Sequence, residues 1–84
     1  MNVERVKANI EHELQKDHSF DEVHWGPSRR EDDGRTRVFV DVGHTETESM
    51  IEADFHSTQF VAERSFMVML SDDGDILDIT EQER

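Results

Sequence analysis

The sequence predicts an α+β domain, in which an antiparallel β-sheet of about four strands carries an N-terminal helix on one face. Three observations predict this fold. Apolar residues recur at helical spacing in residues 3–16 and at alternate positions in residues 35–42. An Asp-Gly turn between two apolar segments in residues 65–80 predicts a β-hairpin. The 84 residues have the length of one domain, which we expect to span residues 1–84.

The first predicted element is a helix over residues 3–16. Its apolar positions follow one another at intervals of three and four residues, which places them on one helical face. These positions are Val3, Val6, Ile10 and Leu14. Asn2 is a residue type that commonly caps a helix, and Glu4 precedes Lys7 by three positions, the spacing of a weak ion pair. We expect the helix to lie across the sheet with its apolar face inward.

A short strand is predicted next, in residues 20–25. Val23 and Trp25 alternate there with other residues and would share one face, and Gly26-Pro27 is expected to end the strand. The charged stretch that follows, residues 28–36, predicts the longest loop of the chain.

The strand predicted over residues 35–42 has two different faces. Three valines line one face, and Arg37, Phe39 and Asp41 line the other. The hairpin in residues 65–80 begins with five consecutive apolar residues, Phe66 to Leu70. Because both faces of such a strand are apolar, we expect it to be central and to need cover on both sides.

Residues 44–64 fit two structures. As a strand, apolar and polar residues alternate, and the chain must turn near residues 57–59 without Gly or Pro. As a helix at about 46–63, the segment has an apolar face, and Thr45 with Glu48 matches a capping box. Both structures are compatible with an α+β domain, and the helical one would give the order helix, hairpin, helix, hairpin.

The net charge is the most unusual property of the chain. It contains 21 Asp and Glu against 9 Lys and Arg, a net charge of −12. Such a surface repels nucleic acid and anionic membranes, and we expect neither as a partner. An acid-rich, lysine-poor composition is also typical of proteins that work in concentrated salt, where acidic surfaces stay hydrated. On this halophile-like interpretation the acidity requires no partner.

The composition also suggests where the protein works and how it is stabilised. The longest apolar run has five residues, too short for a signal peptide or a transmembrane helix, so we expect a cytoplasmic protein. The chain has no cysteine, which excludes disulfides and thiolate metal sites. Dimerisation remains a common means of stabilising so small a domain.

The candidate interface consists of Phe39, Met67 and Met69, which would lie on the sheet face opposite the helix. Methionine packs adaptably and is frequent at interaction surfaces, and Met50 is a further candidate for this face. We expect the face to form a homodimer or to bind a protein partner. If residues 44–64 were helical, that helix would cover the face, and these residues would belong to the core.

A candidate anion or partner loop contains four of the nine basic residues. They are Arg29, Arg30, Arg35 and Arg37. Three acidic residues stand among them, so neutralisation within the loop is one explanation. The other is that the guanidinium groups bind a phosphate or an acidic partner through paired hydrogen bonds.

Metal and catalytic sites are not indicated. His12, His18 and His24 recur every six residues, which is not a ligand spacing on a helix, and neither Asp-rich turn has the spacing of a calcium loop.

On a strand, Glu52, Asp54 and His56 would share a face opposite Arg37 or Phe39. An ion pair between Arg37 and Asp54 is a simpler interpretation of that face than acid-base catalysis. We therefore expect no enzyme and no cofactor.

These patterns predict a small acidic, non-enzymatic protein-interaction module that self-associates through a sheet face. The alternative is an acidic nucleic-acid mimic or a regulator that sequesters a basic protein. Its binding face would include Glu46, Glu48, Glu52 and Asp54.

Overall fold

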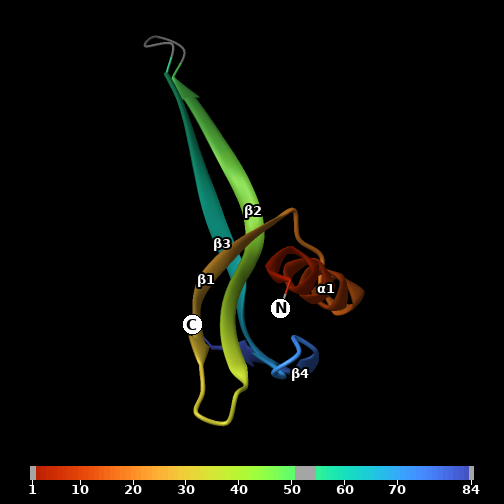
Figure 1. Ribbon diagram of the computed structural model, residues 1–84. Coiled ribbons are helices and arrows are strands. Elements are labelled where there is room, and N and C mark those ends of the chain that lie inside the picture. Colours follow the sequence, from red (N-terminus) through yellow and green to blue (C-terminus); the bar gives the residue numbers. More distant parts are fainter. Residues whose placement is uncertain (1, 51–54, 84) are drawn as a thin grey trace.

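A computed structural model describes residues 2–50 and 55–83. The elements follow the order α1 (Val3–Asp17), β1 (Glu22–Arg30), β2 (Thr36–Met50), β3 (Phe55–Leu70) and β4 (Ile76–Gln82). The strands form one antiparallel sheet in the order β1-β2-β3-β4, and α1 packs against one of its faces (Figure 1). The predicted α+β fold is confirmed. In the described part of the chain, no helix combines the length and the apolar character needed to cross a membrane.

The helix begins and ends where its caps are. The Asn2 side-chain oxygen accepts a hydrogen bond from the Arg5 backbone N–H at 3.2 Å, which satisfies a donor that has no partner within the helix. At the other end, the His18 N–H donates to the Leu14 carbonyl at 3.0 Å, and His18 itself is extended. The expected Glu4–Lys7 ion pair is not formed, because the Lys7 ammonium lies instead over the Trp25 ring.

The core lies between α1 and the two central strands. Its members come from the inward face of the helix and from alternate positions of β2 and β3. They are Ile10, Leu14, Val40, Val42, Phe66, Val68 and Leu70, each at most 2% exposed. Full burial of a side chain of this size contributes about 1.5–3 kcal/mol, so this cluster supplies much of the stabilisation of so short a chain.

Strand β1 is longer than predicted. It continues past Gly26-Pro27 to Arg30, with a register irregularity between Trp25 and Ser28. Proline is tolerated there because β1 is an edge strand. The expectation that Gly26-Pro27 ends the strand is therefore wrong, and the long loop predicted for residues 28–36 is reduced to residues 31–35.

Two turns of similar sequence close one end of the sheet. In the first, the Glu31 N–H donates to the Arg35 carbonyl at 2.7 Å, and in the second the Ser71 N–H donates to the Asp75 carbonyl at 2.8 Å. Each turn contains a glycine at positive φ, 90° at Gly34 and 93° at Gly74, a conformation that glycine adopts without strain.

Residues 44–64 belong to a long hairpin of β2 and β3. The strands pair from Thr36 opposite Leu70 to Met50 opposite Phe55. The helical alternative for residues 46–63 is therefore wrong, and so is the turn expected near residues 57–59, which lie within β3. The connection between the strands falls at residues 51–54, outside the described residues.

The outer half of this hairpin extends beyond the other two strands. Strand β1 begins opposite Gly43, and β4 ends opposite Ser65. Beyond these points β2 and β3 continue as a two-stranded ribbon, which we call the arm, residues 44–50 and 55–61 (Figure 1). At its base the register shifts, because Val42 pairs with Arg64 and Gly43 with Ala62, which leaves one extra residue in β3.

Candidate functional site

The sheet face opposite α1, which we call the outer face, is the candidate interaction surface. Alternation along the strands puts the core residues on the helix side and the intervening residues on the outer face. On the two central strands the outer-face residues are Arg37, Phe39, Asp41, Thr45, Thr47, Thr58, Phe60, Ala62, Ser65, Met67 and Met69. Since α1 is the helix of the described chain and packs on the other side, this face carries no helical cover among the described residues (Figure 1).

The three predicted interface residues lie together at the centre of the outer face. Phe39 is directly opposite Met67, and Met69 follows two positions along the same strand, opposite Arg37. All three side chains are half-buried, although no helix of the described residues packs over them. Neighbouring strands surround the cluster, with Thr80 opposite Met67 and Asp78 opposite Met69 on β4. The structure thus assembles one apolar cluster from two strands. The side chain of Met50 lies outside the described residues.

Sequence reasoning missed a contact between two aromatic rings on the same face. The rings of His24 and Phe60 stack at 3.7 Å between centroids, with an angle of 8° between their planes. This contact joins β1 to the arm, whose Phe60 is opposite Thr45. The alternation in residues 20–25 predicts only that His24 lies on the sheet face opposite that of Val23 and Trp25. The register that brings Phe60 to it depends on the extra residue at the base of the arm.

Charge is balanced on the outer face of the central strands. Its described positions include one basic residue, Arg37, and one acidic residue, Asp41, in a chain with a net charge of −12. The Asp41 carboxylate accepts a hydrogen bond from the Ser65 hydroxyl, directly opposite on β3. Nearby, the Thr45 hydroxyl donates to the Glu22 carboxylate. The first contact lies beside the apolar cluster, and the second lies at the base of the arm.

Three of the four arginines of the predicted loop have acidic partners. Arg35 contacts Asp33 at 2.6 Å, and hydrogen bonds from Arg35 lower the pKa of the Asp33 carboxyl. Arg37 contacts Glu31 at 3.3 Å, and its Nε is buried without a hydrogen-bond partner.

The third pair, between Arg30 and Asp72 at 2.8 Å, joins the last residue of β1 to the turn between β3 and β4. Arg29 has no ion pair within the described residues. Neutralisation within the domain therefore accounts for most of this basic cluster, at the modest energies of exposed pairs.

A histidine is held between two carboxylates at the base of the arm, on the helix side of the sheet. His44 Nε2 lies 3.0 Å from Glu46 Oε1, and its Nδ1 lies 2.8 Å from Glu63 Oε1. Hydrogen bonds to Glu46 and Glu63 raise the pKa of His44 above its ordinary value. The arrangement favours the doubly protonated ring, because only that form donates to both carboxylates.

The predicted position of Arg37 and Phe39 opposite an acidic and histidine face can be compared with the strand register. Arg37 and Phe39 pair with Met69 and Met67, so their predicted position opposite Glu52, Asp54 and His56 is wrong. Glu52 and Asp54 lie outside the described residues, as does the His56 side chain.

The spaced histidines have separate environments. His18 lies against Phe66 with ring centroids 4.9 Å apart, and His24 stacks on Phe60. His12 is exposed on α1. Within residues 2–50 and 55–83, no three His, Asp or Glu side chains are placed to hold a metal ion.

Comparisons of the chain with protein-family models, with curated proteins and with solved structures gave no match. A function for the outer face is therefore argued from its residues and their geometry.

Proposed function

We propose that this protein is a non-enzymatic interaction module that forms a homodimer through the outer face of its sheet. The observation that carries the proposal is the cross-strand pair of Phe39 and Met67, with Met69 beside it, on the face opposite α1. Covering this cluster removes apolar surface from water, which favours association at about 25 cal/mol per Å². Methionine side chains adapt to a facing surface, which suits a self-complementary contact.

A second copy is the partner that the charges favour. Two chains of net charge −12 repel each other over most of their surfaces, but the outer face of the central strands is balanced by Arg37 and Asp41. Contact through this face therefore keeps the acidic residues of α1 and of the turns away from the partner. Salt at molar concentration shortens the Debye length to about 3 Å, which weakens the remaining repulsion.

The arm supports the same proposal. An isolated two-stranded hairpin is at best marginally stable in water, and both edges of the arm present unpaired backbone groups. The outer face runs without a break from Met69 on the body to Phe60 on the arm. Packing against a second copy through this face would cover the arm together with the apolar cluster.

The test is the oligomeric state of a variant with Met67→Glu and Met69→Glu, compared with an Ala8→Glu control. Ala8 is exposed on α1, so its change adds acidic charge away from the outer face. We expect the double variant to sediment as a folded monomer and the control to remain dimeric. A folded double variant that stays dimeric contradicts the proposal. Met67→Gln with Met69→Gln, which adds no charge, provides the comparison if the glutamate variant does not fold.

A further inference from the structure

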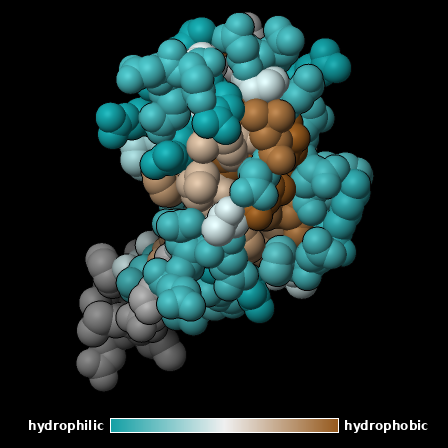
Figure 2. Space-filling model, turned by 90° about the horizontal axis from the view of Figure 1, so that it is seen from below, coloured by the Kyte–Doolittle hydropathy of each residue, from teal (hydrophilic) through white to brown (hydrophobic). Residues whose placement is uncertain are grey.

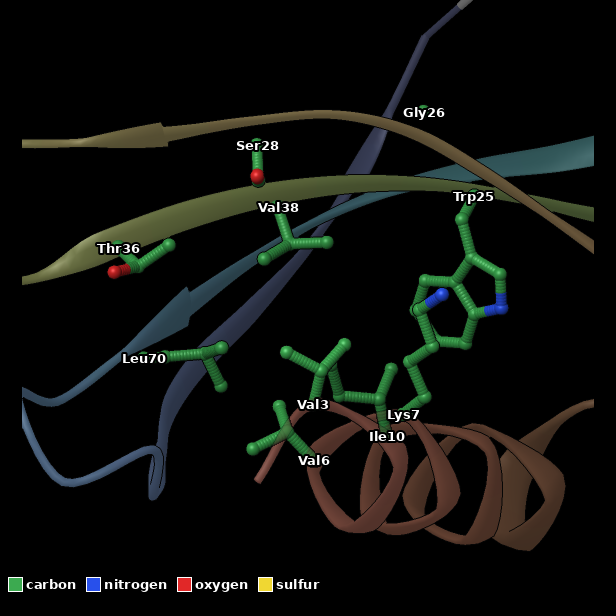
Figure 3. A pocket seen from close by; sticks show the side chains of 10 residues that line it. All are labelled: Val3, Val6, Lys7, Ile10, Trp25, Gly26, Ser28, Thr36, Val38 and Leu70. Atoms are coloured by element: carbon green, nitrogen blue, oxygen red, sulfur yellow. The ribbon is translucent and has the colours of Figure 1, made fainter. Parts of the chain in front are cut away.

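A cavity of about 270 Å³ lies between the N-terminal half of α1 and the sheet, on the side opposite the outer face. This volume is just below the range of about 300–1,000 Å³ that is typical of small-molecule sites. Figure 3 shows side chains of α1 and of the sheet approaching it from opposite sides, with the Trp25 ring at one end. In Figure 2, which views the molecule from below, hydrophobic side chains gather at the centre and hydrophilic ones surround them.

The walls of the cavity are mostly apolar. Helix α1 contributes Val3, Val6 and Ile10, and the sheet contributes Val38 and Leu70. Val3 belongs to the apolar face of the helix, yet its side chain is 58% exposed. The first turn of α1 therefore holds an apolar side chain open to water beside the cavity. A small apolar molecule in the cavity would complete the contact between this turn and the sheet.

Among the described residues, one cationic group, Lys7, lines the cavity. The chain has two lysines, and Lys16 is paired with Glu13 at 2.8 Å. Lys7 has no acidic partner among the described residues, and its ammonium lies 5.5 Å from the centroid of the Trp25 ring. In a chain with 21 acidic residues, an ammonium that lines an apolar cavity without a carboxylate is a place for an anion.

We propose that this cavity binds a small apolar carboxylate, with the hydrocarbon part between α1 and the sheet and the carboxylate on Lys7. The apolar walls provide non-directional burial, and the ammonium selects the anionic head group. The hydroxyl groups of Ser28 and Thr36, which also line the cavity, are further hydrogen-bond donors. An apolar amine would place its charge against Lys7 and is excluded by repulsion.

Trp25 makes the binding measurable, because it is the single tryptophan of the chain and its ring lines the cavity. The experiment titrates the full chain with hexanoate and follows Trp25 emission, with hexanol and hexylamine as the matched neutral and cationic probes. It is done in about 1 M potassium chloride, where the long-range repulsion between the acidic protein and an anion is screened.

The matched variants are Lys7→Met and Lys16→Met, which remove one lysine each. We expect saturable binding of hexanoate, weakened about tenfold by Lys7→Met and unchanged by Lys16→Met, because a charge-assisted hydrogen bond is lost in the first case alone. Lys7→Arg should retain binding. Val6→Phe, which places a larger side chain in the cavity, should abolish the emission change while the circular dichroism stays the same.

Three results would overturn the proposal. The first is the absence of a saturable change in Trp25 emission when hexanoate is added to the unaltered protein. The second is hexanol binding as tightly as hexanoate, and the third is a folded Lys7→Met variant that keeps its affinity. Because the cavity and the outer face lie on opposite sides of the sheet, the dimer measurement and the ligand titration fail or succeed independently.

Discussion

Phe39 and Met67 stand directly opposite each other on the two central strands, on the sheet face that α1 does not cover. Their side chains form one cross-strand pair, so the contribution of each to dimer formation should depend on the presence of the other. We expect Phe39→Ala and Met67→Ala each to weaken a dimer, and the double variant to weaken it by less than the sum of the two. Sedimentation over a range of concentrations measures the three dissociation constants. Strict additivity would show that the two residues act separately.

Gly43 should be essential for the arm. A Cβ at this position would overlap the Val61 carbonyl oxygen. Neither atom can rotate away, because the position of each is fixed by the backbone. We expect Gly43→Ala to lower the free energy of unfolding by about 1–3 kcal/mol and to raise amide exchange rates in the arm. Urea denaturation and hydrogen exchange measure the two effects.

Gly26→Ala is the matched control for this change. A Cβ at Gly26 would lie 3.2 Å from the Phe39 carbonyl oxygen, a tight contact rather than an overlap, so a smaller loss is expected. Equal losses in the two variants would contradict the special role of Gly43.

The contacts of His44 predict a pH dependence at the base of the arm. Hydrogen bonds to Glu46 and Glu63 raise its pKa in the folded protein above the ordinary value of 6.5. Folding therefore gains stability from His44 below about pH 6.5, and this gain is lost as the pH rises through the folded-state pKa. NMR titration of the His44 ring should show the raised pKa.

Glu46→Gln and Glu63→Gln should each lower the pKa of His44 towards its ordinary value, because a neutral amide favours the imidazolium less than a carboxylate does. His44→Gln should remove this part of the pH dependence of unfolding. A His44 pKa that neither glutamine variant changes would contradict the two contacts.

The side chains at the two ends of the apolar face of α1 should contribute differently to the free energy of unfolding. Leu14 is 2% exposed and packs in the core, whereas Val3 is 58% exposed beside the cavity. We expect Leu14→Ala to cost about 2–5 kcal/mol and Val3→Ala about 0.5 kcal/mol or less. Urea denaturation provides both values, and similar losses would show that the first turn of α1 packs as tightly as the last.

Salt should separate the interpretations of the acidic surface. If the net charge of −12 reflects hydration in concentrated salt, circular dichroism should show folding that improves from about 0.1 to 3 M potassium chloride. Sedimentation of the same samples should show dimer formation in parallel. A monomer that is folded at low salt and does not change would instead favour the acidic surface as a binding face for a basic protein.

Local patterns in the sequence determined the helix, the two turns and the faces of the central strands. The spacing of Ile10 and Leu14 and the cap at Asn2 specify α1, and the glycine of each Asp-Gly turn specifies a sheet end, because these signals depend on residues close in the chain. The same alternation placed Phe39, Met67 and Met69 on one face before any register was known.

The tertiary structure alone decided the features that depend on pairing between distant residues. The apolar residues in 44–64 are spaced in a way that fits either a helix or a strand. The strand forms because β2 and β3 exchange hydrogen bonds along their whole length. The stacking of His24 on Phe60 depends on one extra residue in β3. Likewise, Lys7 satisfies the helical spacing for a pair with Glu4, but the packing of α1 brings the Trp25 ring to its ammonium. Such contacts arise only when separate elements meet, which no local pattern encodes.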